Sequence, residues 1–254
     1  MIHKTKLRSI VAALVASAAA LVASAASADP FVSTPCHAGD PLCAPEELAL
    51  AHSPFAAKEN AAALQEVTRG KTVKRSLADR SVTAQDRSQL RALIGRDPHA
   101  GVVLMHKIPR RTDTQAKRLR KLVAAVDGFA PSGACDEIVR EGTGTGLCVG
   151  TADGPVGKIP ARMPVAARLD DGPDGSLHLA IWNPRALEVK ALFSWSPVVS
   201  PDHLKMQIDL FPVADGWLVY TRIALDMSAH TGSAKEIADA MEKLDTWLVR
   251  ELGR

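Results

Sequence analysis

The spacing of hydrophobic and polar residues changes once along this chain, near residue 130. Before that point apolar residues recur three or four positions apart, which is the spacing of one face of a helix. After it, apolar and polar residues alternate as they do in half-buried strands. Helical spacing returns at the end of the chain, over 234–252. The pattern therefore predicts helices, then an antiparallel sheet, then one closing helix.

The first part of the chain contains segments with helical spacing and clear end signals. They predict helices over 54–69, 84–94 and 113–126. Ser53 and Thr83 precede the first two as N-caps, and a Thr112–Gln115 capping box opens the third. The apolar run 101–108 between the second and third helices predicts a strand.

The second part of the chain alternates short apolar segments with turn residues. The expected strands are 135–140, 143–151, 164–169, 176–182, 188–195, 204–211 and 217–225. The alternation is clearest in 204–210, where Leu204, Met206 and Ile208 point one way and the residues between them point to water. This is the pattern of an antiparallel strand with one buried face.

The closing helix has the most regular apolar stripe of the chain. A Ser233–Glu236 capping box precedes it, and Gly253 ends it. The stripe consists of Ile237, Met241, Leu244, Leu248 and Leu252. At about 1.5 Å per residue this helix spans about 28 Å, which is enough to cross a whole sheet.

The first 28 residues have the composition of a secretory signal. A basic start is followed by the Ala/Leu/Val-rich segment 9–22 and by Ala26-Ser27-Ala28, which predicts cleavage before Asp29. The alternative is an uncleaved anchor helix. No later apolar run approaches the ~20 residues that a membrane span requires, so the mature protein is expected to be soluble and exported. The Ala- and Arg-rich composition suggests a bacterial periplasmic or extracellular protein.

Export would place the four cysteines in an oxidising compartment, where an even number favours two disulfides. Cys36 and Cys43 would close a small loop. A two-residue turn at Glu141-Gly142 would set Cys135 opposite Cys148, within disulfide reach. A zinc site is the alternative, although the sequence contains no C-x-x-C.

Charge is distributed unevenly along a chain that is neutral once residues 1–28 are removed. Residues 58–121 contain 16 basic and 6 acidic residues, whereas 122–254 contain 12 basic and 18 acidic residues. A neutral mature protein argues against nucleic acid as a partner. The basic outer face of helix 113–126 would either contact anionic lipid head groups or simply face water. That face consists of Lys117, Arg118, Arg120 and Lys121.

The order of predicted elements resembles the helix-grip fold of the START and polyketide-cyclase-like superfamily. The resemblance covers about 101–252 and includes Asp127-Gly-Phe-Ala-Pro131 after the third helix, the Asp215-Gly216 turn between the last strands, and the closing helix. It implies an α+β domain in which a curved antiparallel sheet wraps a long C-terminal helix. The expected organisation is a signal peptide (1–28), a Pro-rich leader (29–57), a helical extension (58–100) and this domain (101–254).

Members of that superfamily typically hold an apolar ligand between sheet and helix, and some are enzymes. The resemblance therefore implies an apolar cavity here, since one helix and a curved sheet do not always fill the space between them. The residues expected to line it are His178, Trp182, Met206, Ile208, Tyr220, Arg222, Met241 and Leu244.

Motifs for catalysis, cofactors or metals are weak in this sequence. The run Gly142-Thr-Gly-Thr-Gly146 lies between two strands, whereas a phosphate-binding loop would need a helix after it. The acidic turn 170–174 lacks the closing glutamate of a calcium loop. No catalytic residue, cofactor or metal ligand is therefore predicted.

Three functions remain open from the sequence. The leading hypothesis is an exported START-like module that binds or carries an apolar small molecule or lipid. The second is a cyclase- or hydrolase-like enzyme on the same fold, with His178 or Tyr220 as acid or base. The third is a ligand-free envelope protein that docks partners through the leader and the basic helices.

Overall fold

The computed structural model describes residues 45–154, 157–191, 193–227 and 234–254. The expected signal peptide, Cys36 and Cys43 lie outside the described residues, as does the capping residue Ser233. The predictions made for them therefore stay predictions.

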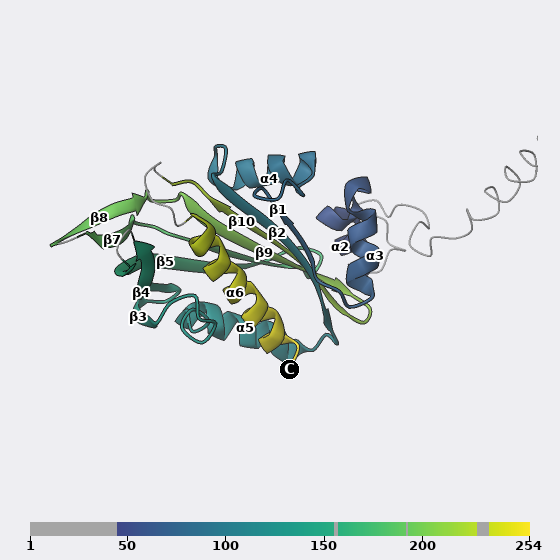
Figure 1. Cartoon of the computed structure of the whole chain (residues 1–254). Coiled ribbons are helices and arrows are strands. Elements are labelled where there is room, and N and C mark those ends of the chain that lie inside the picture. The colour runs from purple at the N-terminus through teal and green to yellow at the C-terminus, as the bar shows by residue number, and fades with distance from the viewer. Residues whose placement is uncertain (1–44, 155–156, 192, 228–233) are drawn as a thin grey trace, which may run out of the picture. The chain divides into compact units, whose positions relative to one another are not determined.

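The described chain builds one large antiparallel sheet (Figure 1). Its strands follow the order β1-β2-β10-β9-β6-β5-β4-β3, with β7 paired to β5 and β8 paired to β7. The strands are β1 (Val73–Ser76), β2 (Ala100–Pro109), β3 (Glu137–Gly142), β4 (Thr145–Gly154), β5 (Gly157–Asp171), β6 (Leu177–Trp182), β7 (Leu187–Ala191), β8 (Ser194–Val199), β9 (Leu204–Val213) and β10 (Gly216–Leu225).

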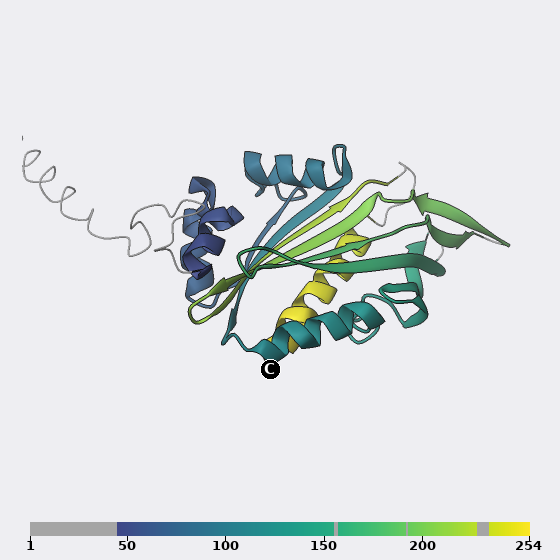
Figure 2. The ribbon, with the colours of Figure 1, turned by 180° about the vertical axis from the view of Figure 1, so that it is seen from behind.

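Helices cover both faces of this sheet (Figures 1 and 2). We call the face under α5 and α6 the inner face, and the face under the N-terminal helices the outer face. The helices are α2 (Pro45–His52), α3 (Ala61–Thr68), α4 (Ala84–Ile94), α5 (Asp113–Ala125) and α6 (Ala234–Leu252), with 3₁₀ turns η1 (Pro54–Ala56) and η2 (Lys58–Asn60). The expected α+β architecture, a curved antiparallel sheet packed on a long C-terminal helix, is confirmed.

Side-chain alternation sends neighbouring residues of the central strands into two separate cores. In β10, Val219 and Ile223 belong to the inner core, whereas Tyr220 and Ala224 belong to the outer core. Almost every residue of β10 is therefore buried, which explains why its sequence reads as a nearly continuous apolar run.

The capping and stop residues predicted the ends of α4 and α5 to within one residue. In α4, Thr83 and Asp86 form a reciprocal capping box, and Gly95 takes the left-handed conformation at the end, with φ 76°. In α5, the Thr112–Gln115 box is present, but the helix stops at Ala125 because Val126 adopts φ 47°.

The helix expected over 54–69 is instead two 3₁₀ turns followed by α3. Ser53 does cap the start, since its hydroxyl accepts from the amide of Phe55. The extended backbone of Ala57 then interrupts the helix, and the Asn60 side chain donates to the Pro54 carbonyl across the break. The segment expected as a Pro-rich leader, 29–57, also contains a helix, α2.

Two strand predictions differ from the structure around residues 157–199. The expected strand 188–195 is the hairpin β7–β8, in which Lys190 pairs with Trp195. The expected strand 164–169 is part of β5, which runs for 15 residues and includes 157–163. This first part of β5 pairs with β4 on one side and with β7 on the other. Backbone hydrogen bonds to these strands therefore extend β5 beyond the segment that the alternation of apolar and polar residues predicted.

The predicted pairing of Cys135 with Cys148 is confirmed, but the register used to predict it is wrong. The two cysteines form a disulfide with their Cα atoms 5.7 Å apart. Across the hairpin, however, Ile138 lies opposite Cys148, and Cys135 precedes β3. The turn is at 143–144 rather than 141–142, because Gly144 supplies the left-handed backbone (φ 69°).

Candidate functional site

Two hollows lie on the inner face, both between the sheet and α6. The larger has a volume of about 100 Å³. It is bounded by β4, β5, β7 and the first half of α6. Its walls are formed by Ala134, Cys148, Gly150, Thr151, Ala152, Ala161, Arg162, Met163, Leu187, Val189, Glu236, Ile237, Ala240 and Met241.

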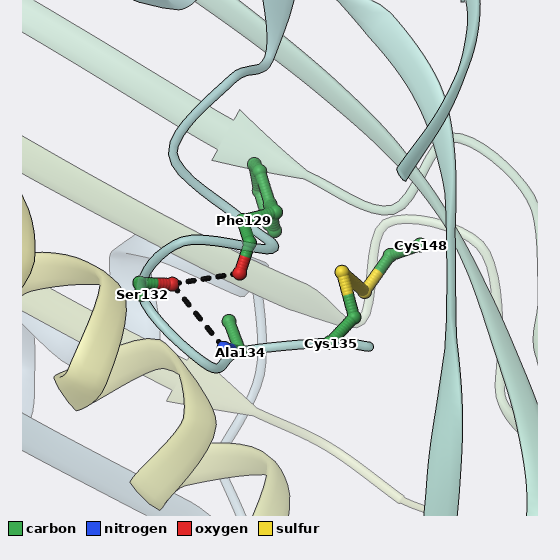
Figure 3. The surroundings of a disulfide bond; sticks show 5 residues. All are labelled: Phe129, Ser132, Ala134, Cys135 and Cys148. Atoms are coloured by element: carbon green, nitrogen blue, oxygen red, sulfur yellow. Dashed lines mark hydrogen bonds between the residues drawn. A yellow bond between two sulfur atoms is a disulfide. The ribbon is translucent and has the colours of Figure 1, made fainter. Parts of the chain in front are cut away.

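The disulfide forms part of the wall of the larger hollow. Cys148 and Ala134 both border it, and Cys135 ties the segment between α5 and β3 to strand β4 (Figure 3). Ser132 closes this loop by donating its hydroxyl to the Phe129 carbonyl (2.8 Å) and accepting from the Ala134 amide (3.2 Å). The cross-link therefore holds one side of the hollow in place.

Two charged residues, Arg162 and Glu236, are part of a mostly apolar lining. The Nε and Nη2 atoms of Arg162 both lie 2.6 Å from Oε2 of Glu188, and its guanidinium lies 4.3 Å from the ring centre of Trp195. This geometry is an ion pair with a cation–π contact, and it holds the guanidinium against β7 and β8. Glu236, from α6, is the other charged residue of the lining.

The smaller hollow, about 30 Å³, is bounded by α5, α6, β5 and β6. Leu244, Trp247 and Leu248 of α6 form one wall. Gly128 forms another, and a Cβ on it would approach the Trp247 ring to 2.7 Å. The loop after α5 therefore needs glycine in order to pack this closely on the helix.

The structure divides the eight residues expected to line one cavity between the two faces. Met206, Ile208, Met241 and Leu244 lie in the inner core. Met241 borders the larger hollow, and Leu244 borders the smaller. Met206 and Ile208 are fully buried and border neither hollow. His178, Trp182, Tyr220 and Arg222 lie on the outer face, because each precedes or follows an inner-core residue in its strand.

His178 is the centre of a polar cluster on the outer face. Its Nδ1 lies 2.8 Å from Oδ1 of Asp209, and its Nε2 lies 3.0 Å from the Ser176 hydroxyl. Arg222 also donates to Asp209, over 2.5 Å. A serine, a histidine and an aspartate in this order resemble a hydrolase triad.

Contacts of Ser176 argue against a nucleophile in this cluster. Its hydroxyl donates its only proton to Asp174 over 2.5 Å, and the residue is buried. A Cβ at Gly172 would collide with this hydroxyl, so backbone already covers it. Burial disfavours the charged form of Asp174, but hydrogen bonds from the Ser176 hydroxyl and amide outweigh it and lower the pKa of this carboxyl. The group therefore reads as a turn held by hydrogen bonds.

Tyr220 is part of a second outer-face network, beneath α4. Its hydroxyl lies 3.0 Å from Oδ1 of Asp86 and 2.9 Å from Oε1 of Gln89. Arg75 donates to the other oxygen of Asp86 over 3.0 Å. Burial first, and the negative charge of Asp86 second, raise the pKa of Tyr220 well above its usual value. This tyrosine is a structural donor, and it lies on the opposite face of the sheet from both hollows.

A buried histidine–aspartate pair on the inner face was missed by sequence reasoning. Nε2 of His106 (β2) lies 2.6 Å from Oδ2 of Asp245 (α6), and Thr221 donates to the other oxygen over 2.6 Å. Neither His106 nor Asp245 borders a hollow. The pair joins the helix to two strands. Asp245 lies four residues after Met241 and therefore on the apolar face of α6. An acidic residue on that face was the signal from which the sequence could have predicted a buried polar contact.

Among the described residues, no group of three or more His, Cys, Asp or Glu side chains is placed to hold a metal ion. No helix in the described ranges is both long and apolar enough to cross a membrane.

Comparisons with known proteins give similarity of structure only. No family model and no curated protein matches this chain. Among solved structures, it is similar to a STAR-related lipid transfer protein from Xanthomonas axonopodis, with a TM-score of 0.38 and 11% identity over 61% of this chain and 86% of that one. A putative uncharacterized protein from Rhizobium leguminosarum matches with a TM-score of 0.36 and 12% identity, over 59% and 94%.

The protein Ara h 8.0201 is similar with a TM-score of 0.33 and 12% identity, over 60% of this chain and 94% of that one. At these scores and identities the likeness concerns the arrangement of helices and strands alone.

Proposed function

We propose that this protein binds an apolar small molecule in the larger hollow, between the sheet and the first half of α6. The observation that carries the proposal is the composition of that hollow. Apart from Arg162 and Glu236, its lining consists of apolar side chains, one glycine and one threonine. Affinity would come from burying apolar surface, at roughly 25 cal/mol per Å².

The size of the hollow limits the ligand. Its volume of about 100 Å³ is below the ~150 Å³ of an engineered cavity that binds benzene, and below the ~300 Å³ at which pockets for drug-sized ligands begin. In the conformation described, a small apolar ring is the upper limit. A lipid chain would require the first half of α6 to move away from β4 and β5.

Binding can be tested with two probes of different size. Benzene, followed by NMR shifts of the Met163 and Met241 methyl groups, reports on the hollow as it stands. A fluorescent fatty acid reports on whether the walls open. We expect benzene to shift both methyl groups, and a protein that binds neither probe would contradict the proposal.

A filling variant tests where the probe binds. Ala240 borders the hollow, so Ala240→Leu should occupy the space and abolish benzene binding. Thr246 is exposed on the same helix, so Thr246→Leu adds a similar side chain outside the hollow and serves as the control. Equal binding by both variants would exclude this hollow as the site.

Export is the second part of the proposal. The Cys135–Cys148 disulfide supports it, because such cross-links persist in oxidising compartments. N-terminal sequencing of the protein from a bacterial host that secretes it should begin at Asp29. Recovery of the chain in the membrane fraction with Met1 retained would contradict the signal-peptide interpretation.

A further inference from the structure

The turn of the β7–β8 hairpin holds the most exposed large apolar side chain among the described residues. Phe193 is 100% exposed, and the other such residue, Val139, is 46% exposed. Leaving a phenylalanine in water forgoes the free energy of its burial, so apolar surroundings would stabilise this side chain. Figure 1 shows the hairpin extending past the ends of the neighbouring strands.

The chemistry around Phe193 fits a lipid interface. Residues 191–196 contain no charge. Directly below the turn, Lys190 and Trp195 face each other across the hairpin. Tryptophan and lysine beside an apolar tip are the residues that settle at the head-group level of a bilayer, because each combines an apolar body with a polar end.

A second copy of this chain is a poorer fit to the same surface. Within the described chain, β7 is the strand that pairs with β8, so β8 lies at an edge of the sheet. Pro197 lies inside β8 and lacks the amide proton that a partner strand would need. Proline in an edge strand is a common protection against pairing between molecules.

The base of the hairpin forms part of the wall of the larger hollow. Leu187 and Val189, at its base, are part of the lining. Arg162 borders the hollow as well, and it contacts both Glu188 of β7 and Trp195 of β8. A surface that receives Phe193 would therefore lie next to the wall of the hollow.

We propose that the hairpin tip, centred on Phe193, inserts into the interfacial region of a lipid bilayer and brings the larger hollow to the membrane surface. The second half of this statement rests on the proposed function, because it makes the membrane the source of the apolar ligand. The first half stands independently on the hairpin.

Vesicle flotation tests the insertion. Full-length mature protein is mixed with phosphatidylcholine–phosphatidylglycerol vesicles and floated at low and at high salt. We expect the wild type to float under both conditions, because the contact is apolar. Phe193→Ser should reduce the partition by about tenfold, as expected for withdrawing one phenylalanine from an apolar environment. Val139→Ser, at the other exposed apolar side chain, is the matched control and should float like the wild type.

Several results would overturn the proposal. One is that the wild type fails to float with the vesicles, and another is that Val139→Ser loses as much flotation as Phe193→Ser. Flotation that disappears at high salt would also overturn it, since binding would then be due to cations such as Lys117 and Lys121. A concentration-dependent dimer in analytical ultracentrifugation that Phe193→Ser abolishes would instead show that a second copy covers the tip.

The benzene assay, performed without vesicles, separates this proposal from the proposed function. Flotation without benzene binding leaves the membrane contact standing and removes the ligand site. Benzene binding without flotation removes the membrane contact alone.

Discussion

The inner and outer faces of the sheet are built from alternate residues of the same strands, yet their cores differ in chemistry. The outer core contains a dense polar network, in which Tyr220, Asp86 and Arg75 are hydrogen-bonded beneath α4. The inner core is apolar along most of α6, and both hollows lie there. Its main polar contact is the pair of His106 with Asp245.

The difference indicates which face is available for binding. Hydrogen bonds are directional, so the outer network holds the N-terminal helices to the sheet in one arrangement. Apolar contacts between α6 and the sheet are less directional, and the space beside the first half of α6 is incompletely filled. A ligand can replace missing contacts on the inner face without breaking a hydrogen bond.

The largest expected effect comes from removing the centre of the outer network. Asp86→Ala should lower the free energy of unfolding by about 3–5 kcal/mol, because it leaves Arg75, whose side chain is only 12% exposed, without its carboxylate and removes the cap of α4. Urea unfolding measures the change. Asp79→Ala, at an exposed carboxylate nearby, should change stability little. A similar loss in both variants would show that the outer face is not held by this network.

Loss of the disulfide should be the next largest effect. Cys135 and Cys148 are 13 residues apart in sequence, and closing a loop of this size stabilises by about 3 kcal/mol in the chain-entropy model. The double variant Cys135→Ser/Cys148→Ser should show this loss in urea unfolding and should also weaken benzene binding, because Cys148 borders the hollow. Unchanged binding would mean that the wall does not need the cross-link.

Two substitutions on α6 compare the closed and the hollow parts of the inner core. Leu244→Trp adds bulk beside a hollow of only about 30 Å³, so it should overpack and cost about 1–3 kcal/mol. Ala240→Leu, beside the larger hollow, should cost much less. Thermal unfolding of the two variants is the measurement. A larger loss of stability in Ala240→Leu would show that the space beside Ala240 is the more closely packed of the two.

The smallest effect concerns the hydroxyl of Tyr220. Tyr220→Phe should cost about 1 kcal/mol, which is typical of one lost hydrogen bond. The pKa of Tyr220 is raised in the folded protein, so the stabilisation is complete below the ordinary tyrosine pKa of about 10 and is lost as the pH rises above it. Because the chain contains one tyrosine, ultraviolet absorbance of tyrosinate reports on this residue alone.

The wild type should therefore ionise its tyrosine only as it unfolds at alkaline pH, and the destabilisation between neutral and alkaline pH should be smaller in Tyr220→Phe. Ionisation of Tyr220 near pH 10 in the folded state would contradict the buried donor.

Sequence reasoning succeeded for elements whose signals are local. The caps of α4 and α5 and the apolar stripe of α6 predicted these helices almost to the residue, since capping and stripe both act within one helix. It failed for the hairpin β7–β8 and for the first half of β5, which pairing with other strands supports. Phe55, before the break at Ala57, packs edge-on against Phe211 and Tyr220 of the sheet, which are far from it in sequence.

By itself, the sequence determined that this protein is an α+β chain with an antiparallel sheet and a closing helix, and it identified the partner of Cys135. Only the tertiary structure decided which side chains share a space. Neighbouring residues in a strand point to opposite faces, so a one-residue difference separates Tyr220 from Thr221 by the thickness of the sheet. When both faces are buried, hydropathy cannot tell the two apart, and only the packed helices show which face holds the hollow.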